Sequence, residues 1–233
     1  MTATDARSVT SSWLPQQFGD GRAARVPDPI VEPLWMGRRV LAQIDAGPRV
    51  TFRDVDGEAI EDQPEIETEL LRAVRGGRLV LEGYLTHQPV QDLGTVARRD
   101  AVEPPRSAEV ISQWWFGGLG RRRKKRYAEE AEAAGRSRLP AGVTIAFVAV
   151  DLLWLDAEPL LDVPLLERKR ILESVLDESG LVRRGIYVRP PVDPWLGSWR
   201  SFGFTRMAYK AANSRYRPGE INQDWAIAAV PDR

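Results

Sequence analysis

The sequence Val31-Glu-Pro-Leu-Trp-Met-Gly-Arg-Arg39 lies where a proline-rich lead-in gives way to the first regular pattern of the chain. Three prolines between residues 27 and 33 forbid a helix there. Two segments with the β-branched and apolar residues of strands follow this stretch, at Val40–Asp45 and Arg49–Arg53. Asp56-Gly57 then supplies a hairpin-type turn. The stretch is therefore expected to lead into a small antiparallel meander.

Further along the chain, periodic segments alternate between helical and extended types. The expected helices are Asp62–Arg75, Ser107–Phe116, Arg121–Ala134 and Pro164–Ser179, and Pro191–Phe202 is an irregular or helical connection. The expected strands are Arg78–Thr86, Val143–Leu155, Leu181–Val188, Phe204–Lys210 and Trp225–Val230. Paired strands with helices between them and few β-α-β signals predict an α+β fold, built on antiparallel sheets with flanking helices.

The composition excludes several classes of function. The chain has 33 basic and 33 acidic residues, so its net charge provides no general attraction to nucleic acid or membranes. It has no cysteine, which excludes disulfides and thiolate chemistry. Its single histidine, His87, is expected to be structural or solvent-facing, and no metal site is expected. No apolar run approaches the roughly 18 residues of a membrane span, so the protein is expected to be cytoplasmic.

Five short motifs follow one another in a characteristic order. They are Glu32-Pro33 with Gly37 and Arg39, Leu79–Leu85, Val150–Asp156 with Pro164–Arg168, Phe204–Lys210, and Ser214–Gly219 with Asp224-Trp225. This order resembles the nucleotidyltransferase (adenylation) domain of ATP-dependent DNA ligases, over roughly residues 27–230. The resemblance implies an ATP-grasp-like domain at 27–233, with a polar insertion at about 87–141. Residues 1–26 lack periodicity and are expected to form a flexible N-terminal segment, and no OB-fold domain is expected after the fifth motif.

The resemblance also implies a pocket whose chemistry has been lost. In that family a lysine attacks the α-phosphate of ATP, acidic groups contact the ribose or the metal, and further lysines bind phosphate. The matched positions carry other residues: Leu34 for the attacking lysine, then Met36, Tyr84, Thr205, Ile227 and Ala229. The residues retained for a nucleotide pocket are Glu32, Gly37, Arg39, Glu82, Gly83 and Lys210. No catalytic residue is therefore expected, and ATP or AMP with Mg²⁺ would bind only if a residual site still functions.

Some side chains in this region have two interpretations. Lys210 and Arg39 would either bind an anion or form ion pairs with Glu82 or Glu32. Trp35 and Met36 are expected to fill part of the adenine pocket. A nucleophile elsewhere in the chain would have to be Lys124, Lys125 or Lys169, which lack the strand context of the motif.

The strongest cluster of charge lies in the insertion. It consists of Arg121, Arg122, Arg123, Lys124, Lys125 and Arg126, and either binds phosphate backbones or forms a solvated helix face. Trp114 and Trp115 precede it and would either stack on bases or anchor the insertion to the protein.

Three hypotheses for the function follow. The first is a catalytically degenerate ligase-like domain, a pseudoenzyme with a binding or accessory role in DNA repair, whose partner is DNA or a DNA-repair protein. The second is an active ATP-dependent DNA ligase or related nucleotidyltransferase with an unusual site. The third is a structural or interaction protein that acts through Trp114–Arg126. The sequence defines no oligomeric state.

Overall fold

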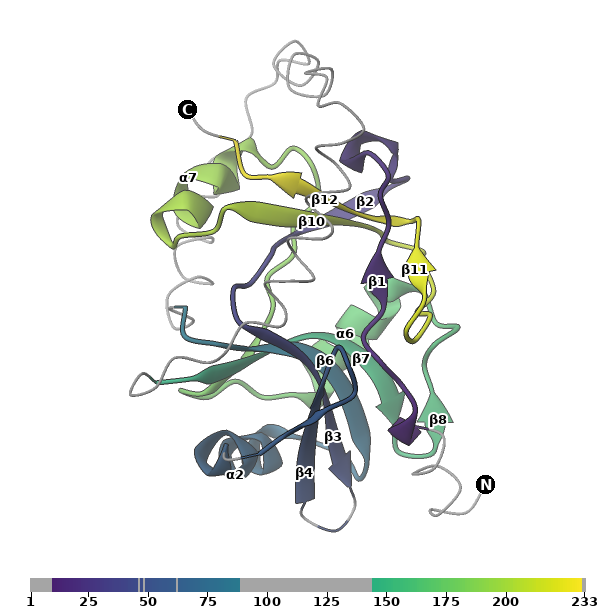
Figure 1. Ribbon diagram of the computed structural model, residues 1–233, viewed down its shortest axis with the longest axis vertical. Coiled ribbons are helices and arrows are strands. Elements are labelled where there is room, and N and C mark those ends of the chain that lie inside the picture. The colour runs from purple at the N-terminus through teal and green to yellow at the C-terminus, as the bar shows by residue number, and fades with distance from the viewer. Residues whose placement is uncertain (1–9, 46, 48, 62, 89–143, 232–233) are drawn as a thin grey trace.

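The described chain comprises residues 10–45, 47, 49–61, 63–88 and 144–231 of a computed structural model, and forms two facing β-sheets and a separate pair of two-residue strands (Figure 1). The smaller sheet is antiparallel and has the strand order β12-β10-β2. Its strands are β2 (Pro29–Pro33), β10 (Arg206–Ala211) and β12 (Trp225–Ala229). The α+β class predicted from the sequence is confirmed, with antiparallel pairing throughout both sheets except for the short strand β9.

The larger sheet has the order β5-β4-β3-β6-β7-β8, with β9 added to β7. Its strands are β3 (Arg38–Asp45), β4 (Arg49–Asp54), β5 (Ala59–Ile60), β6 (Leu79–Thr86), β7 (Ala146–Leu155), β8 (Glu158–Pro159) and β9 (Val182–Arg184). The meander predicted from residues 40–57 is confirmed, because β3 pairs with β4 and β4 with β5. Asp54 Oδ1 closes the last turn by accepting hydrogen bonds from the N–H groups of Asp56 and Glu58, both at 3.0 Å.

Among the described residues, the helices α2 (Pro64–Ala73), α6 (Leu165–Val175) and α7 (Asp193–Ser201) flank the sheets. Helix α6 ends four residues before the predicted Ser179. The chain leaves the helix because Leu176 forms a β-bridge with Val74 at the end of α2. The N–H of Asp177 also donates to the carbonyl of Ala73 at 2.8 Å. Pairing with a distant segment thus replaces the last helical turn.

The segment predicted as a strand at Leu181–Val188 is extended over only three residues, in β9. The N–H of Gly185 still donates to the carbonyl of Ala149 in the larger sheet, at 2.7 Å. Val188 instead exchanges two hydrogen bonds with Val31 in the smaller sheet, at 2.8 and 2.9 Å. The segment is not one long strand because it crosses from one sheet to the other.

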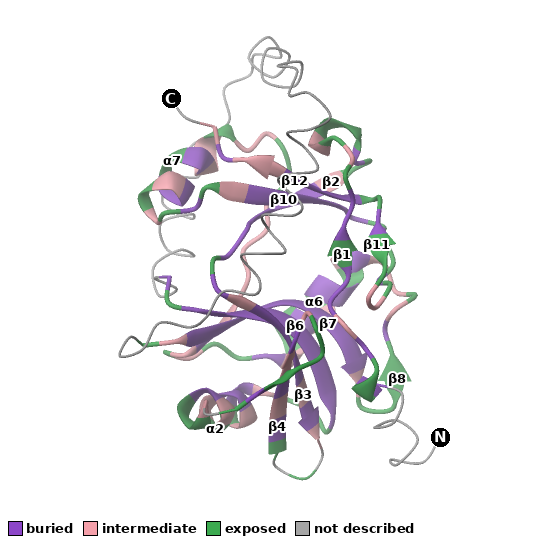
Figure 2. Ribbon diagram, in the orientation of Figure 1, coloured by how far each residue is buried: buried purple, intermediate pink, exposed green. Residues whose placement is uncertain are grey.

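Two hydrophobic clusters cover the two faces of the larger sheet. The central strands of that sheet are buried over most of their length (Figure 2). Successive side chains of β6 point to opposite faces, so Val80 and Tyr84 join one cluster and Leu79 and Leu81 join the other. The inter-sheet cluster includes Trp13, Phe18, Leu34, Trp35, Tyr84, Trp154, Trp199, Phe204, Tyr209, Tyr216, Trp225 and Ile227. The helix-side cluster lies under α2 and α6 and includes Val40, Ile44, Phe52, Ile66, Leu70, Leu81, Phe147, Leu172 and Leu176.

The segment before β2 is packed against the protein over the residues that are described. Strand β1 (Gln17–Phe18) pairs in parallel with β11 (Ile221–Asn222), and η1 (Ala23–Arg25) follows it. Figure 1 shows β1 running between the two halves of the molecule. Flexibility, the expectation for residues 1–26, does not describe residues 10–26, because Trp13 and Phe18 are buried in the inter-sheet cluster. No helix among the described residues has the length and apolar character needed to cross a membrane.

Candidate functional site

Two lysines from different elements converge on Glu32. Glu32 lies in β2 opposite Ala208 of β10, and its Oε2 accepts a hydrogen bond from Lys210 Nζ at 2.9 Å. Its Oε1 forms an ion pair with Lys169 Nζ at 2.5 Å, and Lys169 comes from α6. Lys169 also donates to the carbonyl of Val150 at 2.7 Å. All three charged side chains are buried, so the cluster is shielded from water.

Burial and ion pairing act in opposite directions on the pKa values of this cluster. Burial tends to raise the pKa of Glu32, but the positive charges of Lys169 and Lys210 outweigh it and hold that pKa below its ordinary value. Burial lowers the pKa of Lys169, and attraction to Glu32 only partly opposes that effect. Glu32 is therefore ionised at neutral pH.

A second buried group joins Arg39, Glu82 and Tyr216. Arg39 Nε and Nη2 donate to Glu82 Oε1 at 2.8 and 2.6 Å. Tyr216 Oη donates to Glu82 Oε2 at 2.5 Å, so both carboxylate oxygens are engaged. Burial, followed by the negative charge of Glu82, raises the pKa of Tyr216 well above its ordinary value. The ion pairs considered for Lys210 and Arg39 from the sequence are thus both present.

Helix α6 supplies a third buried pair. Arg168 donates from Nε and Nη2 to the two oxygens of Asp151 at 2.8 and 2.7 Å, and neither side chain is exposed. Burial acts to lower the pKa of Arg168, but Asp151 outweighs it and raises that pKa. Leu165, Arg168, Lys169 and Leu172 are buried at the i, i+3, i+4, i+7 spacing of one helix face. This spacing is the signal that would have placed the two charged residues inside.

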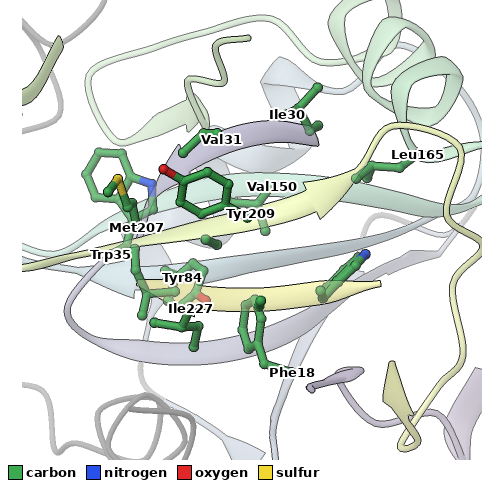
Figure 3. Packing of buried hydrophobic residues seen from close by; sticks show 14 of the residues in the cluster. Phe18, Ile30, Val31, Trp35, Tyr84, Val150, Leu165, Met207, Tyr209 and Ile227 are labelled. Atoms are coloured by element: carbon green, nitrogen blue, oxygen red, sulfur yellow. The ribbon is translucent and has the colours of Figure 1, made fainter. Parts of the chain in front are cut away.

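Six positions were expected from the sequence to lack the chemistry of the ligase family, and three of them lie in the inter-sheet cluster. Leu34, Tyr84 and Ile227 are only 8%, 5% and 9% exposed. Figure 3 shows Tyr84 and Ile227 pointing into the packed space between the sheets, together with Phe18. Thr205 is exposed and Ala229 half-buried. The structure therefore surrounds the position matched to the attacking lysine with apolar side chains.

Trp35 and Met36 behave differently from each other. Trp35 is buried and its ring lies edge-on to Phe204, with centroids 4.9 Å apart. Met36 is 40% exposed, so only Trp35 of the two adds to the packed interior, and the expectation that they fill part of the adenine pocket stays a prediction. Its backbone is held by the end of β6, since its N–H donates to Gln88 Oε1 at 2.6 Å and its carbonyl accepts from Thr86 Oγ1 at 2.5 Å. These two bonds turn the Met36 side chain outward.

The two retained motif glycines have packing reasons of their own. Gly37 has a φ of +136°, and a Cβ there would lie 2.1 Å from the carbonyl oxygen of Leu85. A Cβ on Gly83 would lie 2.5 Å from the ring of Phe147. Neighbouring atoms leave no room for a side chain at either position. Both glycines are therefore needed for the larger sheet to pack, whether or not a ligand binds.

Gln16 is a site residue that the sequence did not reveal. Its N–H donates to Tyr216 Oη at 2.9 Å, and its carbonyl accepts from Arg39 Nη2 at 2.6 Å. Its side-chain Oε1 accepts from the N–H of Arg217 at 2.5 Å. Gln16 is completely buried, so residues before β2 complete the Arg39–Glu82–Tyr216 group. The apolar pattern of Trp13, Leu14 and Phe18 is the signal that this segment packs.

The remaining candidates lie at the surface or outside the described residues. His87 is exposed, as expected. Two of the candidates lie outside the residues that the structure describes. They are the basic run Arg121–Arg126, which includes Lys124 and Lys125, and the pair Trp114 and Trp115. The structure therefore brings together the motif residues of the two sheets and says nothing of the insertion.

Comparison with solved structures identifies the fold. The ligase domain of M. tuberculosis LigD matches with a TM-score of 0.59 and 18% identity, covering 92% of this chain and 58% of that one. A mycobacterial DNA ligase D complexed with ATP and MES matches with a TM-score of 0.58 and 17% identity, covering 92% and 59%. No family model and no curated protein matches the sequence. The fold is that of the DNA ligase adenylation domain, and the chain spans under two thirds of each of these structures.

Proposed function

We propose that this protein is a catalytically degenerate ligase-like adenylation domain, which acts by binding a partner and does not transfer AMP. The observation that carries the proposal is the state of the motif residues. Leu34 lies among apolar side chains, while the retained Glu32, Glu82 and Lys210 are ion-paired with other residues of the same chain.

The nucleophile is the first requirement that fails. Formation of a phosphoramide needs an amine that can lose its proton, and the side chain of Leu34 has none. Lys169 is the best remaining candidate for the nucleophile, because burial lowers the pKa of its amine. It is only 2% exposed, however, and its amine is held by Glu32 and by the carbonyl of Val150. An attack by Lys169 on a nucleotide would require this cluster to open.

The phosphate and metal contacts are the second requirement. Lys210 would have to leave Glu32 to bind a phosphate, and breaking a buried ion pair costs about 3–5 kcal/mol. Mg²⁺ needs free oxygen ligands, whereas both oxygens of Glu82 already accept hydrogen bonds. The side chains at these positions do not fit a nucleoside triphosphate with its metal.

Incubation with ATP radiolabelled at the α-phosphate, with Mg²⁺ or Mn²⁺, tests the proposal on a denaturing gel. We expect no labelled protein, beside an active DNA ligase as positive control. Leu34→Lys should also remain unlabelled, because Tyr84, Ile227 and Ala229 still lack the accompanying groups. Leu34→Met is the matched control for folding. A labelled band from the wild-type chain contradicts the proposal, and its loss in Lys169→Met would assign the nucleophile.

The partner that we propose is DNA or a DNA-repair protein, because the similar solved structures are DNA ligases. Binding to nicked duplex and to single-stranded DNA should be measured at low and at raised salt. Contacts with phosphates release counterions, so DNA binding should weaken as salt rises. If no DNA binds at either salt concentration, the proposed partner is a DNA-repair protein and not DNA itself.

A further inference from the structure

Residues 182–188 cross from the larger sheet to the smaller one, and Tyr187 in this crossing segment contacts a buried lysine. The centroid of the Tyr187 ring lies 5.2 Å from Lys169 Nζ. The hydroxyl of Tyr187 donates to Glu173 Oε1 at 3.1 Å, and Glu173 is exposed on α6, about one turn after Lys169. A single half-buried side chain therefore spans the distance between the amine of Lys169 and the surface of the protein.

The backbone on each side of Tyr187 is held by one of the two sheets. The N–H of Gly185 donates to a carbonyl of the larger sheet at 2.7 Å. Val188 exchanges two hydrogen bonds with Val31 of the smaller sheet, at 2.8 and 2.9 Å. These bonds fix the crossing segment at both ends, and so keep the ring of Tyr187 over Lys169.

The two lysines that share Glu32 are covered by different rings. The ring of Trp225 lies 4.3 Å from Lys210 Nζ, and Trp225 is completely buried. The ring over Lys169 belongs to Tyr187, which is only half-buried. Lys169 is therefore separated from solvent by a partly exposed side chain, whereas Lys210 lies behind a tryptophan of the core.

The amine of Lys169 has the chemical character of a nucleophile. Burial lowers its pKa, and attraction to Glu32 only partly opposes that effect. A lower pKa increases the fraction of neutral amine, which is the form that attacks an electrophile. Lys169 is nevertheless only 2% exposed. What keeps this amine from reacting is its cover.

We propose that Tyr187 is an autoinhibitory contact, which covers the amine of Lys169 and prevents it from attacking nucleotides and other electrophiles. Tyr187 acts through Lys169, so it is a positioning residue and not a catalytic one. This inference rests on the proposed function, because it names the contact that keeps the remaining lysine inactive in a domain that transfers no AMP.

Acetylation of the folded full chain by acetic anhydride at neutral pH tests the inference. A neutral amine displaces acetate from the anhydride and becomes an amide, and mass spectrometry of peptides gives the rate at each lysine. Tyr187→Ala should acetylate Lys169 about tenfold faster than the wild type or more, because the ring contact that must open is lost. Lys210 should keep its wild-type rate, because Trp225 still covers it.

Two further variants separate the ring of Tyr187 from other contributions. Tyr187→Phe keeps the ring and loses only an exposed hydrogen bond, so the rate at Lys169 should stay within about threefold of the wild type. Phe202→Ala is the matched control, because it removes another half-buried ring of the inter-sheet cluster, at the end of α7. It should leave the rate at Lys169 unchanged.

Three outcomes would overturn the inference. Lys169 reacts equally fast in the wild type and in Tyr187→Ala, or Phe202→Ala accelerates Lys169 as much as Tyr187→Ala does, or Lys169 and Lys210 accelerate together. The last result is also that of an unfolded variant, and it would make Tyr187 a general support of the core. Labelling by ATP is measured separately on the wild-type chain, so failure of either proposal can be distinguished from failure of the other.

Discussion

The two faces of the larger sheet are packed by different kinds of residues. The helix-side cluster is mostly aliphatic, with Phe52 and Phe147 as its aromatic members. The inter-sheet cluster contains five tryptophans beyond Trp13, namely Trp35, Trp154, Trp199, Trp225 and the partly buried Trp195, together with buried ions beside it. A single strand contributes to both, since Leu81 of β6 faces the helices and Glu82 is ion-paired on the other face. One face is an ordinary core, whereas the other is a core built around charge.

The difference shows how charged groups are accommodated inside a core. Apolar residues such as Leu34 and Ile227 are buried on the same face as the charged groups. The remaining charges had to be neutralised because an unpaired buried charge is costly. Their partners come from far along the chain: Lys210 is 178 residues from Glu32, and Tyr216 is 134 residues from Glu82. The stability of the inter-sheet face should therefore depend on charge and pH, and that of the helix-side face should not.

The largest expected effect is that of Glu32→Ala. This change leaves Lys169 and Lys210 buried without their shared carboxylate, and should lower the free energy of unfolding by about 3–5 kcal/mol. Glu167→Ala is the matched control on the surface of α6, where its ion pair with Arg170 is exposed and should contribute under about 1 kcal/mol. Urea denaturation measures both. Equal losses in the two variants would contradict the distinction between the buried cluster and the surface.

A smaller effect is expected from Tyr216→Phe. The change removes the hydroxyl that donates to Glu82 and accepts from the N–H of Gln16, and should cost about 1–3 kcal/mol. Tyr187→Phe removes an exposed hydrogen bond to Glu173 and serves as its control. Thermal denaturation should separate the two variants. If Tyr216→Phe is as stable as the wild type, the buried hydroxyl makes no net contribution.

The smallest expected effect is on stability at acid pH, which should change for a variant of the inter-sheet face and stay constant for a variant of the helix-side face. The pKa of Glu32 is below its ordinary value in the folded protein, so its stabilising contribution is present above about pH 4.5 and is lost as the pH falls through the folded pKa. The stability difference between wild type and Glu32→Gln should therefore shrink as the pH is lowered. The difference for Leu70→Ala, in the helix-side cluster, should stay constant. Urea titrations at several pH values measure both, and parallel curves for both variants would refute the assignment.

Local patterns predicted most of the regular elements, because their cause is local. The spacing of Ile66 and Leu70 predicted α2. The apolar residues of Arg78–Thr86 predicted a partly buried strand, and β6 is buried along its whole length. The predictions failed where a distant segment competes for the backbone. Leu176 leaves the helix to pair with Val74, and Val188 leaves β9 to pair with Val31. Periodicity contains no information on such partners.

The residues of the candidate site were likewise predicted only in part. The motif order was enough to single out Glu32, Arg39, Glu82 and Lys210, and to suggest that they form ion pairs. It gave no reason to add Lys169, which was considered only as a remote nucleophile. Gln16 was also missed, because it lies in a segment expected to be flexible. Both residues belong to the site through contacts between elements that are far apart in sequence.

By itself, the sequence determined which chemical groups the protein has: no cysteine, one histidine, and no amine on the side chain of Leu34. Covalent identity is independent of folding, so these exclusions hold in any structure. Only the tertiary structure decided that Leu34 is enclosed by apolar side chains, that Glu32 is shared by two lysines, and that Gln16 lies beside Arg39. The physical reason is that burial and ion pairing are properties of neighbours in space, which the folding of two sheets onto one another brings together.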